Sequence, residues 1–423
     1  MASVFVLLVF STVLFSPIRE SAAASESDSY GIVTYNVRFL RHASENETEY
    51  ARRQRAVVET LTQAEADVLC LQEVWVPDDI DDIVQKTRDA FPYHHRITVP
   101  GPDPTRVPCE PGPASEFSTC AATRCSSATT DEELLACAYL LCNAEINNIG
   151  QECVLCLLLN SHLGLTVSLG FCLQPGRYSP THGLLMLSKR RLSDKKEFSF
   201  SANETLLLTR GYISAMIEDV GHVFCTHLTT RLAGSPVYFG SSQFSNYTQE
   251  QLHQVNLLLT AADSAAKASA YGVVVAGDMN HGPEIGDRIQ GDNVDVYNVV
   301  LRRGYADPYV ANMSEARCTL CRANPLALAS IEAFDGSPNG THEGNILDHV
   351  YVPSNDVSRV VGAQRIWDEP VVFEGHSLYL SDHYGVQLQY VPPVVDVNDA
   401  IDEWRSSFSE WKQKFGEWQE DEC

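Results

Sequence analysis

The sequence predicts a fold of the α/β (α+β) class, because short apolar strands alternate with amphipathic helices along most of its 423 residues. Two departures from this alternation divide the chain. A cysteine-rich insertion is expected at 101–176, and an amphipathic helix rich in aromatic and acidic residues at 396–423. With a leader at 1–24, this leaves one large domain built from 25–100 and 177–395.

Each expected strand is a run of β-branched or other apolar residues bounded by turn-forming residues. The run at 66–75 is apolar except for Asp67, Gln72 and Glu73, and the four apolar residues 273–276 predict a buried strand. A tight turn from Asp219 to Gly221 predicts a hairpin. In chain order, strands are expected at 30–39, 66–75, 93–99, 183–192, 196–201, 211–219, 221–229, 271–280, 346–352, 359–366 and 384–390.

Helices are expected where apolar residues recur at steps of three and four, because that spacing places them on one face. Leu252, Val255 and Leu258 mark such a face in the longest of these segments. The two mixed halves of the domain would suit a pseudo-symmetric pair of sheets. In chain order, helices are expected at 50–64, 78–90, 249–270 and 294–303.

The insertion is expected to carry its own disulfides. Cys120 and Cys125 are five positions apart, as are Cys137 and Cys142, and 131–142 has the pattern of a helix. A two-helix hairpin held by two disulfides follows from this spacing, although the pairing of the cysteines stays open.

Two further features of the insertion have more than one interpretation. Cys153 and Cys156 resemble half of a zinc or redox site, but no partner pair with histidine spacing follows, so disulfides are favoured. The apolar stretch 154–173 would either face lipid or form the core of the insertion. The second outcome is the more ordinary one for such a stretch.

Three sequence features predict a secreted protein. Residues 1–24 contain the apolar run and the small residues of a signal peptide. Thirteen cysteines are typical of an oxidising compartment. Asn-X-Ser/Thr sequons, which suit a glycoprotein, occur at Asn46, Asn203, Asn246, Asn312 and Asn339.

The chain is strongly acidic, with a formal net charge of −25. A polyanion that approaches such a surface is repelled unless metal ions and a local basic patch offset the charge. Nucleic acid is therefore disfavoured as a substrate. The alternative interpretation is that the acidic surface only keeps a secreted protein soluble.

The tail carries aromatic and aliphatic residues at alternating steps of three and four, at Ile401, Trp404, Phe408, Trp411, Phe415 and Trp418. One interpretation is a helix that packs on the domain or on a second copy of the chain. The other is an interfacial helix whose rings lie at the headgroup level of a membrane. Its acidic faces would then favour zwitterionic over anionic lipid.

Polar residues stand at the ends of several apolar strands, where a rigid backbone can present them to a shared pocket. The segments concerned are Tyr35-Asn36-Val37-Arg38, Leu71-Gln72-Glu73-Val74, Thr226-His227-Leu228, Gly277-Asp278-Met279-Asn280, Leu347-Asp348-His349-Val350 and Ser381-Asp382-His383. In this order and spacing the chain resembles the endonuclease/exonuclease/phosphatase superfamily. The resemblance implies a two-layer β-sandwich flanked by helices, the four-layer fold of deoxyribonuclease I.

The resemblance also implies a divalent metal, Mg²⁺ or alternatively Mn²⁺ or another divalent cation. Glu73 would be the principal ligand, with Asn36 beside it and Asp382 nearby. Carboxylate and amide oxygens suit such a hard cation, and its charge would stabilise the negative transition state of phosphodiester hydrolysis.

Five further residues receive catalytic roles by the same resemblance. His383, oriented by Asp348, would act as general base or contact the phosphate. Asp278 would align or deprotonate the attacking water, and Asn280 would hold a phosphoryl oxygen. His227 would serve as general acid or phosphate clamp, because histidine changes protonation near neutral pH. Whether Asp278 or His383 takes the proton stays open.

Within the superfamily, the motifs are similar to those of secreted neutral sphingomyelinases, which the short segment 323–327 also resembles. This implies a phospholipid substrate, such as sphingomyelin, met at a membrane surface through the insertion or the tail helix. The chain departs from that pattern at Gly385, at His349 and in the insertion. The rival hypotheses are a secreted nuclease, which the net charge opposes, and a non-catalytic binding protein on the same scaffold.

Overall fold

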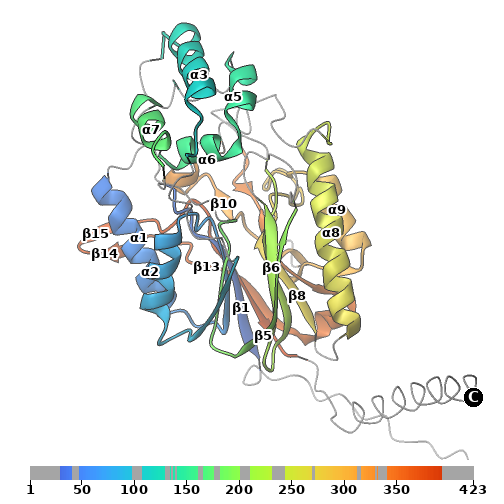
Figure 1. Cartoon of the computed structure of the whole chain (residues 1–423). Coiled ribbons are helices and arrows are strands. Elements are labelled where there is room, and N and C mark those ends of the chain that lie inside the picture. Colours follow the sequence, from blue (N-terminus) through green and yellow to red (C-terminus); the bar gives the residue numbers. More distant parts are fainter. Residues whose placement is uncertain are drawn as a thin grey trace, which may run out of the picture.

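The structure is a computed structural model that describes residues 29–40, 47–97, 107–128, 134, 137–138, 141–160, 165–175, 182–200, 210–230, 243–268, 272–311, 316–328, 331 and 341–392. Two six-stranded sheets form its centre, with helices on their outer faces (Figure 1). This confirms the predicted class and the four-layer arrangement. The predicted leader and tail helix lie outside the described residues.

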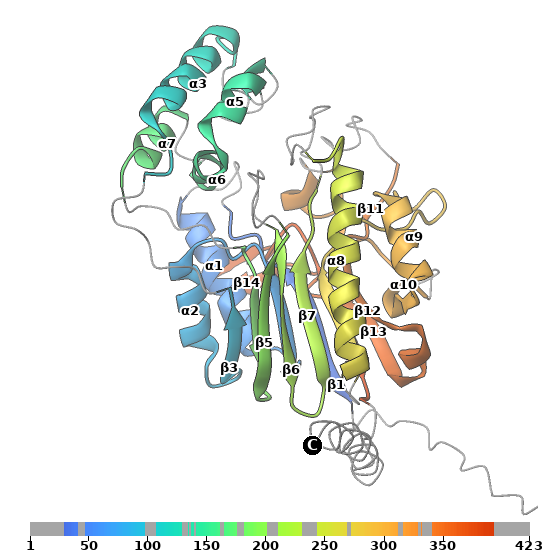
Figure 2. The same ribbon diagram turned by 45° about the vertical axis from the view of Figure 1, so that its right-hand side comes forward.

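The first sheet has the strand order β13-β16-β1-β2-β4-β3. Its strands are β1 (Tyr30–Asn36), β2 (Val68–Gln72), β3 (Tyr93–Arg96), β4 (Leu185–Ser188), β13 (Val360–Ile366) and β16 (Gly385–Tyr390). Helices α1 (Glu47–Thr62) and α2 (Pro77–Thr87) cover its outer face (Figure 2). Leu61 and Ile83 from these helices share a buried cluster with Leu69 of β2.

The second sheet has the order β5-β6-β7-β8-β12-β9. Its strands are β5 (Leu192–Ser199), β6 (Gly211–Ile217), β7 (Gly221–His227), β8 (Val273–Asp278), β9 (Tyr305–Ala306) and β12 (Asp348–Pro353). Its outer face packs on α8 (Tyr247–Ala268) and α9 (Val294–Arg302), where Leu258 and Val296 meet Val275. The predicted hairpin joins β6 to β7, and Asp219 and Gly221 in its turn have φ of 63° and 118°.

Each strand and helix predicted for the large domain has a counterpart among the described residues, whereas most of the helix predicted at 131–142 lies outside them. Sequence patterns did not predict the shortest elements, which are too brief to show a period. These are α10 (Pro308–Ala311), β10 (Leu320–Cys321), β11 (Gly344–Asn345), the 3-10 helix Ser354–Arg359, β14 (Val371–Phe373) and β15 (His376–Leu378), together with β9. Among the described helices, none combines the length and apolar character needed to cross a bilayer.

The main core lies between the two sheets. Ile32 and Val68 of the first sheet pack there with Ile213 and Val274 of the second. A disulfide from Cys70 in β2 to Cys225 in β7 crosses this core and links the sheets covalently.

Among its described residues, the insertion contains helices α3 (Pro111–Arg124), α5 (Asn143–Ile149), α6 (Gln151–Leu159) and α7 (Leu165–Cys172), which lie beyond one end of the sheets (Figures 1 and 2). Val154, Leu157, Leu165 and Leu169 are buried in a core that belongs to the insertion alone. Of the two interpretations of 154–173, the structure therefore supports the core.

Disulfides close the insertion. Its bonds join Cys109 to Cys153, Cys120 to Cys142, Cys125 to Cys137 and Cys156 to Cys172. The second and third of these staple α3 to the segment before α5, as the five-residue spacing predicted. Because the cysteines at 153 and 156 each bind another cysteine, neither is free to hold a metal.

The inter-sheet disulfide provides a stability prediction. Cys70 and Cys225 are 155 residues apart, whereas the Cys318–Cys321 bond spans only 3. Loop-closure entropy then predicts that Cys70→Ala/Cys225→Ala lowers the free energy of unfolding by up to about 5 kcal/mol, against about 2 kcal/mol for Cys318→Ala/Cys321→Ala. Urea denaturation of both double variants checks this, and equal losses would contradict it.

Candidate active site

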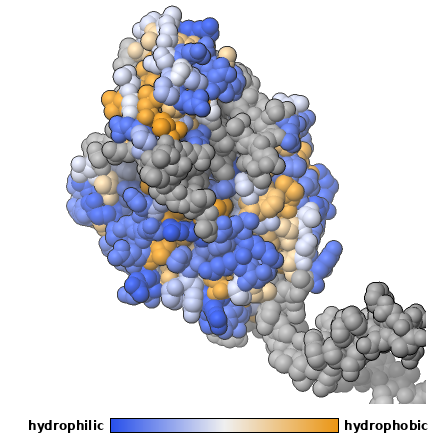
Figure 3. Space-filling view, viewed as in Figure 1, coloured by the Kyte–Doolittle hydropathy of each residue, from blue (hydrophilic) through white to orange (hydrophobic). Residues whose placement is uncertain are grey.

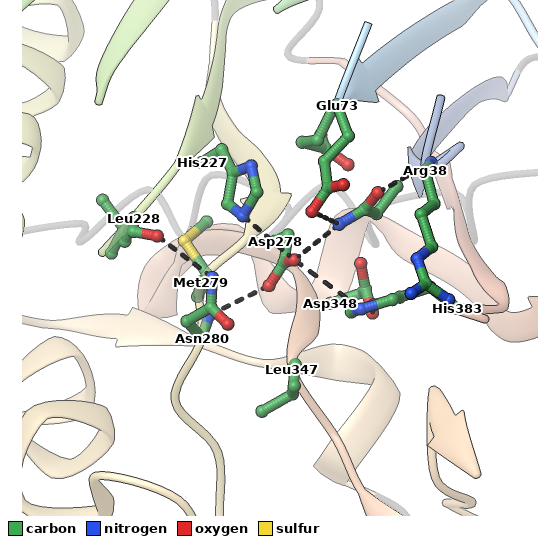
Figure 4. Close-up of polar contacts among 12 residues, drawn as sticks. Arg38, Glu73, His227, Leu228, Asp278, Met279, Asn280, Leu347, Asp348 and His383 are labelled. Atoms are coloured by element: carbon green, nitrogen blue, oxygen red, sulfur yellow. Dashed lines mark hydrogen bonds and ion pairs between the residues drawn. The ribbon is translucent and has the colours of Figure 1, made fainter. Parts of the chain in front are cut away.

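The predicted site residues meet at one edge of the β-sandwich, where strand ends from the two sheets face each other. Asn36 ends β1 and Glu73 follows β2 in the first sheet, while His227 ends β7 and Asp278 ends β8 in the second. Figure 4 shows the Glu73, His227, Asp278, Asp348 and His383 side chains pointing toward one another. Side chains that are far apart in the sequence therefore meet in one largely buried polar cluster, the candidate pocket.

The Asn36 amide joins the two sheets. Its Nδ2 donates to Oε1 of Glu73 at 3.1 Å and to Oδ2 of Asp278 at 2.9 Å. Its Oδ1 accepts from the backbone N of Arg38 at 3.0 Å, which fixes the orientation of the amide. Two carboxylates from different sheets thus accept hydrogen bonds from the same neutral amide group.

The backbone is strained at two of these strand ends. Glu73 and Asn280 have φ of 62° and 48°, a region that costs non-glycine residues roughly 1–2 kcal/mol. The surrounding contacts impose this conformation. At Asn280, Nδ2 donates to the carbonyl of Leu228 at 3.0 Å, and the backbone N donates to Oδ1 of Asp278 at the same distance. One N–H of the Asn280 amide, which is predicted to hold a phosphoryl oxygen, is therefore already engaged by the protein, and the second N–H stays available for that role.

Asp278 lies at the centre of the pocket and is only 2% exposed. Its Oδ2 lies 3.3 Å from Nε2 of His227 and 3.9 Å from Nε2 of His383. Burial alone would raise the pKa of this carboxyl, but the charge of His383, the contact with His227 and the Asn36 hydrogen bond hold the pKa well below its usual value. Asp278 is therefore ionised at neutral pH.

The two histidines have opposite protonation states. Burial lowers the pKa of His383, but the negative charges of Asp348 and Asp278 outweigh it and hold the pKa well above 6.5. Its Nδ1 donates to Oδ2 of Asp348 at 2.8 Å. Burial, together with nearby Arg210, lowers the pKa of His227. At neutral pH, His383 is an imidazolium and His227 a neutral imidazole.

Asp382 and its neighbours form the support of this pocket. Oδ2 of Asp382 lies 3.1 Å from a guanidinium nitrogen of Arg38, so its charge is already paired. Ser381 Oγ donates to the carbonyl of Asn36 at 2.7 Å, and Asn324 Nδ2 donates to the carbonyl of Ser381 at 2.8 Å. Arg38 stands within one of the sequence motifs, but the motif itself predicted no role for it.

Two sets of residues here could hold a cation. Ligand atoms of Asp278, Asp348 and His383 all lie within 4.8 Å of one another. However, the Asp348–His383 hydrogen bond already occupies Nδ1 of the histidine. Glu73 and Asp278 offer carboxylate oxygens, the donors that a hard divalent cation prefers. Asn36 could add its amide oxygen only by turning its amide, because Nδ2 faces both carboxylates and Oδ1 accepts from the backbone N of Arg38. The donor chemistry of this second set fits the predicted metal.

The chain is similar to a known protein family and to several solved structures. The family model described as the endonuclease/exonuclease/phosphatase family matches residues 33–383. That span contains every predicted site residue. A search of curated proteins found no match.

Solved structures with a similar fold act on different substrates according to their titles. Sphingomyelinase C from Streptomyces griseocarneus is 16% identical, over 86% of this chain and 99% of that chain, with a TM-score of 0.47. TDP2 of D. rerio with a single-strand DNA product is 15% identical over the same shares, also with a TM-score of 0.47. A 3'-5' exonuclease from Neisseria meningitidis is 12% identical, over 85% and 99%, with a TM-score of 0.48.

The Asp348–His383 pair predicts the effect of one substitution. Asp348→Asn keeps the shape of the side chain but removes the charge that orients the imidazolium, so hydrolysis of bis(4-nitrophenyl) phosphate should fall by about 10²- to 10⁴-fold. The matched control is Asp307→Asn, because Asp307 binds Nδ1 of buried His349 in the same way, at 2.7 Å. The control should lower the melting temperature and keep most activity. Equal activity losses would contradict the assignment.

His383 also predicts a pH dependence of stability. Since its pKa is raised above the ordinary 6.5, its contribution is fully present below about pH 6.5 and is lost as pH rises through the folded pKa. Above pH 6.5 the free energy of unfolding should fall by up to about 1.4 kcal/mol per pH unit from this group. Urea denaturation in EDTA should show a flatter slope for His383→Gln, and identical slopes would exclude this origin.

Proposed function

Because the chain belongs to the endonuclease/exonuclease/phosphatase family, whose members hydrolyse phosphodiester bonds, we propose that it is a secreted, metal-dependent phospholipid phosphodiesterase of the sphingomyelinase type. The observation that carries this proposal is the Asn36 amide, which holds Glu73 and Asp278 together beside two histidines of opposite protonation state. Such a pocket contains an ionised base, a protonated acid and ligands for a cation.

The metal would be held by Glu73 and Asn36, with Asp382 as the third ligand that the family resemblance assigns. Asp382 would have to release Arg38 first, and Asn36 would have to turn its amide so that Oδ1 replaces Nδ2 beside Glu73, so we rank both below Glu73. Bound Mg²⁺ or a similar divalent cation would offset the negative charge that develops on the phosphoryl oxygens.

The chain's own residues supply the proton transfers. Asp278, ionised and buried, would orient the water and take its proton as the water oxygen bonds to phosphorus. As the bond to the leaving oxygen breaks, His383 would give it the proton on Nε2. Neutral His227 would hold a phosphoryl oxygen through an N–H group. Because Asp278 Oδ2 lies 3.9 Å from His383 Nε2, the proton can return to His383 after product leaves.

The charge of the chain favours a lipid over a nucleic acid. A net charge of −25 repels a polyanion, whereas a phosphocholine lipid has no net charge. The insertion returns to the domain close to the pocket, since the carbonyl of Gly183 accepts from the N of Val74, the residue after Glu73. It therefore stands where it would shape the entrance for a lipid.

Membrane contact is the second element of the proposal. Helix α7 has no charged residue, and Val167 on it is 58% exposed. Apolar residues gather at the insertion in Figure 3. We propose that this part of the insertion, with the tail helix, contacts the surface of a zwitterionic membrane.

Secretion is the third element of the proposal. Six disulfides are consistent with an extracellular protein. The signal peptide at 1–24 and the glycans at the sequons belong to the proposal. Of these sequons, Asn246 lies within the described residues and is exposed, whereas Asn46, Asn203, Asn312 and Asn339 lie outside them.

A substrate panel tests the proposed function. With Mg²⁺ or Mn²⁺, the protein should release phosphocholine from sphingomyelin vesicles, and EDTA should abolish the release. Glu73→Gln keeps the size of the metal ligand without its charge and should lower the rate by about 10²-fold or more. Glu374→Gln is the control, because Glu374 forms only a surface ion pair with Arg55. This substitution should leave the rate of phosphocholine release unchanged.

Two outcomes would overturn the lipid assignment. The first is cleavage of naked DNA without turnover of any lipid, which would favour the nuclease. The second is the absence of any phosphodiester cleavage under every metal condition, which would favour a binding protein.

A further inference from the structure

Arg210 is a buried cation at the wall of the pocket, and none of the roles described so far uses it. It directly precedes β6 and is only 2% exposed. The next residue, Gly211, pairs with His227 across the ladder between β6 and β7. Arg210 therefore enters the molecule beside a residue of the site.

The guanidinium of Arg210 has unsatisfied donors. Its Nε and Nη1 are buried and have no hydrogen-bond partner, and among the described residues no carboxylate forms an ion pair with it. Glu73, Asp278 and buried Glu250 are close enough to act on its charge from a distance. Burying a charge in this way destabilises the fold unless a partner compensates for it. The fold alone gives no reason to keep this arginine.

Packing fixes the position of the guanidinium. It lies over the ring of Trp75, 5.6 Å from the centroid, where the π face attracts a cation. On the Trp75 ring, Gly183 packs so closely that a Cβ there would come within 3.0 Å of a ring carbon. The same ring lies 6.3 Å from the ring of His227. A stacking contact holds Arg210 and leaves its N–H groups available.

An anion with several oxygens is the ligand that this arrangement fits. A guanidinium presents donors in a fixed fork that matches a phosphate group. The carboxylates of Glu73 and Asp278 would repel an incoming phosphodiester, and a local cation offsets that repulsion. We propose that Arg210 binds a non-bridging oxygen of the scissile phosphate and is paired only when substrate occupies the pocket. This inference rests on the proposed function, of which it specifies one binding contact.

The alternative is that Arg210 balances the charges of Glu73 and Asp278 within the fold. The two roles predict opposite effects of Arg210→Gln. If Arg210 binds phosphate and is unpaired without it, Arg210→Gln should not lower the melting temperature, because the variant no longer buries an unpaired charge. A structural counter-charge would lower the melting temperature on removal and leave phosphate binding unchanged.

Thermal unfolding with and without inorganic phosphate tests the proposal without a turnover assay. Phosphate should raise the melting temperature of the wild-type protein, and Arg210→Gln should lose this rise. Arg53→Lys is the matched control, because Arg53 is equally buried but donates to backbone carbonyls such as that of Leu40. The control should melt at a lower temperature and keep the rise with phosphate.

Kinetics on bis(4-nitrophenyl) phosphate add a second readout. Arg210→Gln should lower kcat/KM by about 10²-fold, the size expected for one charge-assisted hydrogen bond to phosphate. Arg210→Lys keeps the charge without the forked donors of the guanidinium, so its kcat/KM should lie between those of the wild-type protein and Arg210→Gln. If Arg210→Gln does not fold, a reduced phosphate effect in Arg210→Lys supports the proposal by the same measurement.

The outcomes separate this inference from the proposed function. No phosphate effect in the wild type, or the same effect in the Arg210 variants, would overturn the inference. A phosphate effect that depends on Arg210, in a protein that releases no phosphocholine from sphingomyelin, would contradict only the lipid substrate.

Discussion

The contact on which the site depends is the pair of hydrogen bonds from the Asn36 amide to Glu73 and Asp278. These carboxylates come from different sheets, and each would repel the other without a donor or a cation between them. The core between the sheets and the Cys70–Cys225 bond hold the strands in the register that brings the two acids together. The packing of the sandwich thus sets the geometry of the pocket.

The pocket keeps opposite charges close together inside a strongly acidic protein. Asp278 stays ionised because His383 is protonated, and His383 stays protonated because Asp278 and Asp348 surround it. His227 stays neutral because burial and Arg210 disfavour a second proton there. Asp278 is therefore the base, His383 the acid and His227 a neutral donor, and both histidines lie next to the Asp278 carboxylate. Arg210 adds a charge whose partner would arrive with the substrate.

Sequence reasoning located the strands and their polar ends because a buried strand leaves a long apolar run, and a polar residue that ends such a run stands out. The pairing of Asp382 with Arg38 was not predictable, since it depends on two loops from distant parts of the chain. Arg210 gave no signal, because a single arginine before a strand is usually a surface residue. The ion pair of His349 with Asp307 joins positions 42 apart and needed the fold to be recognised.

A double-mutant cycle tests the central claim that one amide couples the two sheets into a single catalytic unit. The measurement is kcat/KM for phosphodiester hydrolysis by Asn36→Ala, Asp278→Ala and the double variant. Residues that act as a unit are non-additive, so the double variant should be little worse than the more damaging single variant, with a coupling above about 1 kcal/mol. Additive losses would contradict the claim.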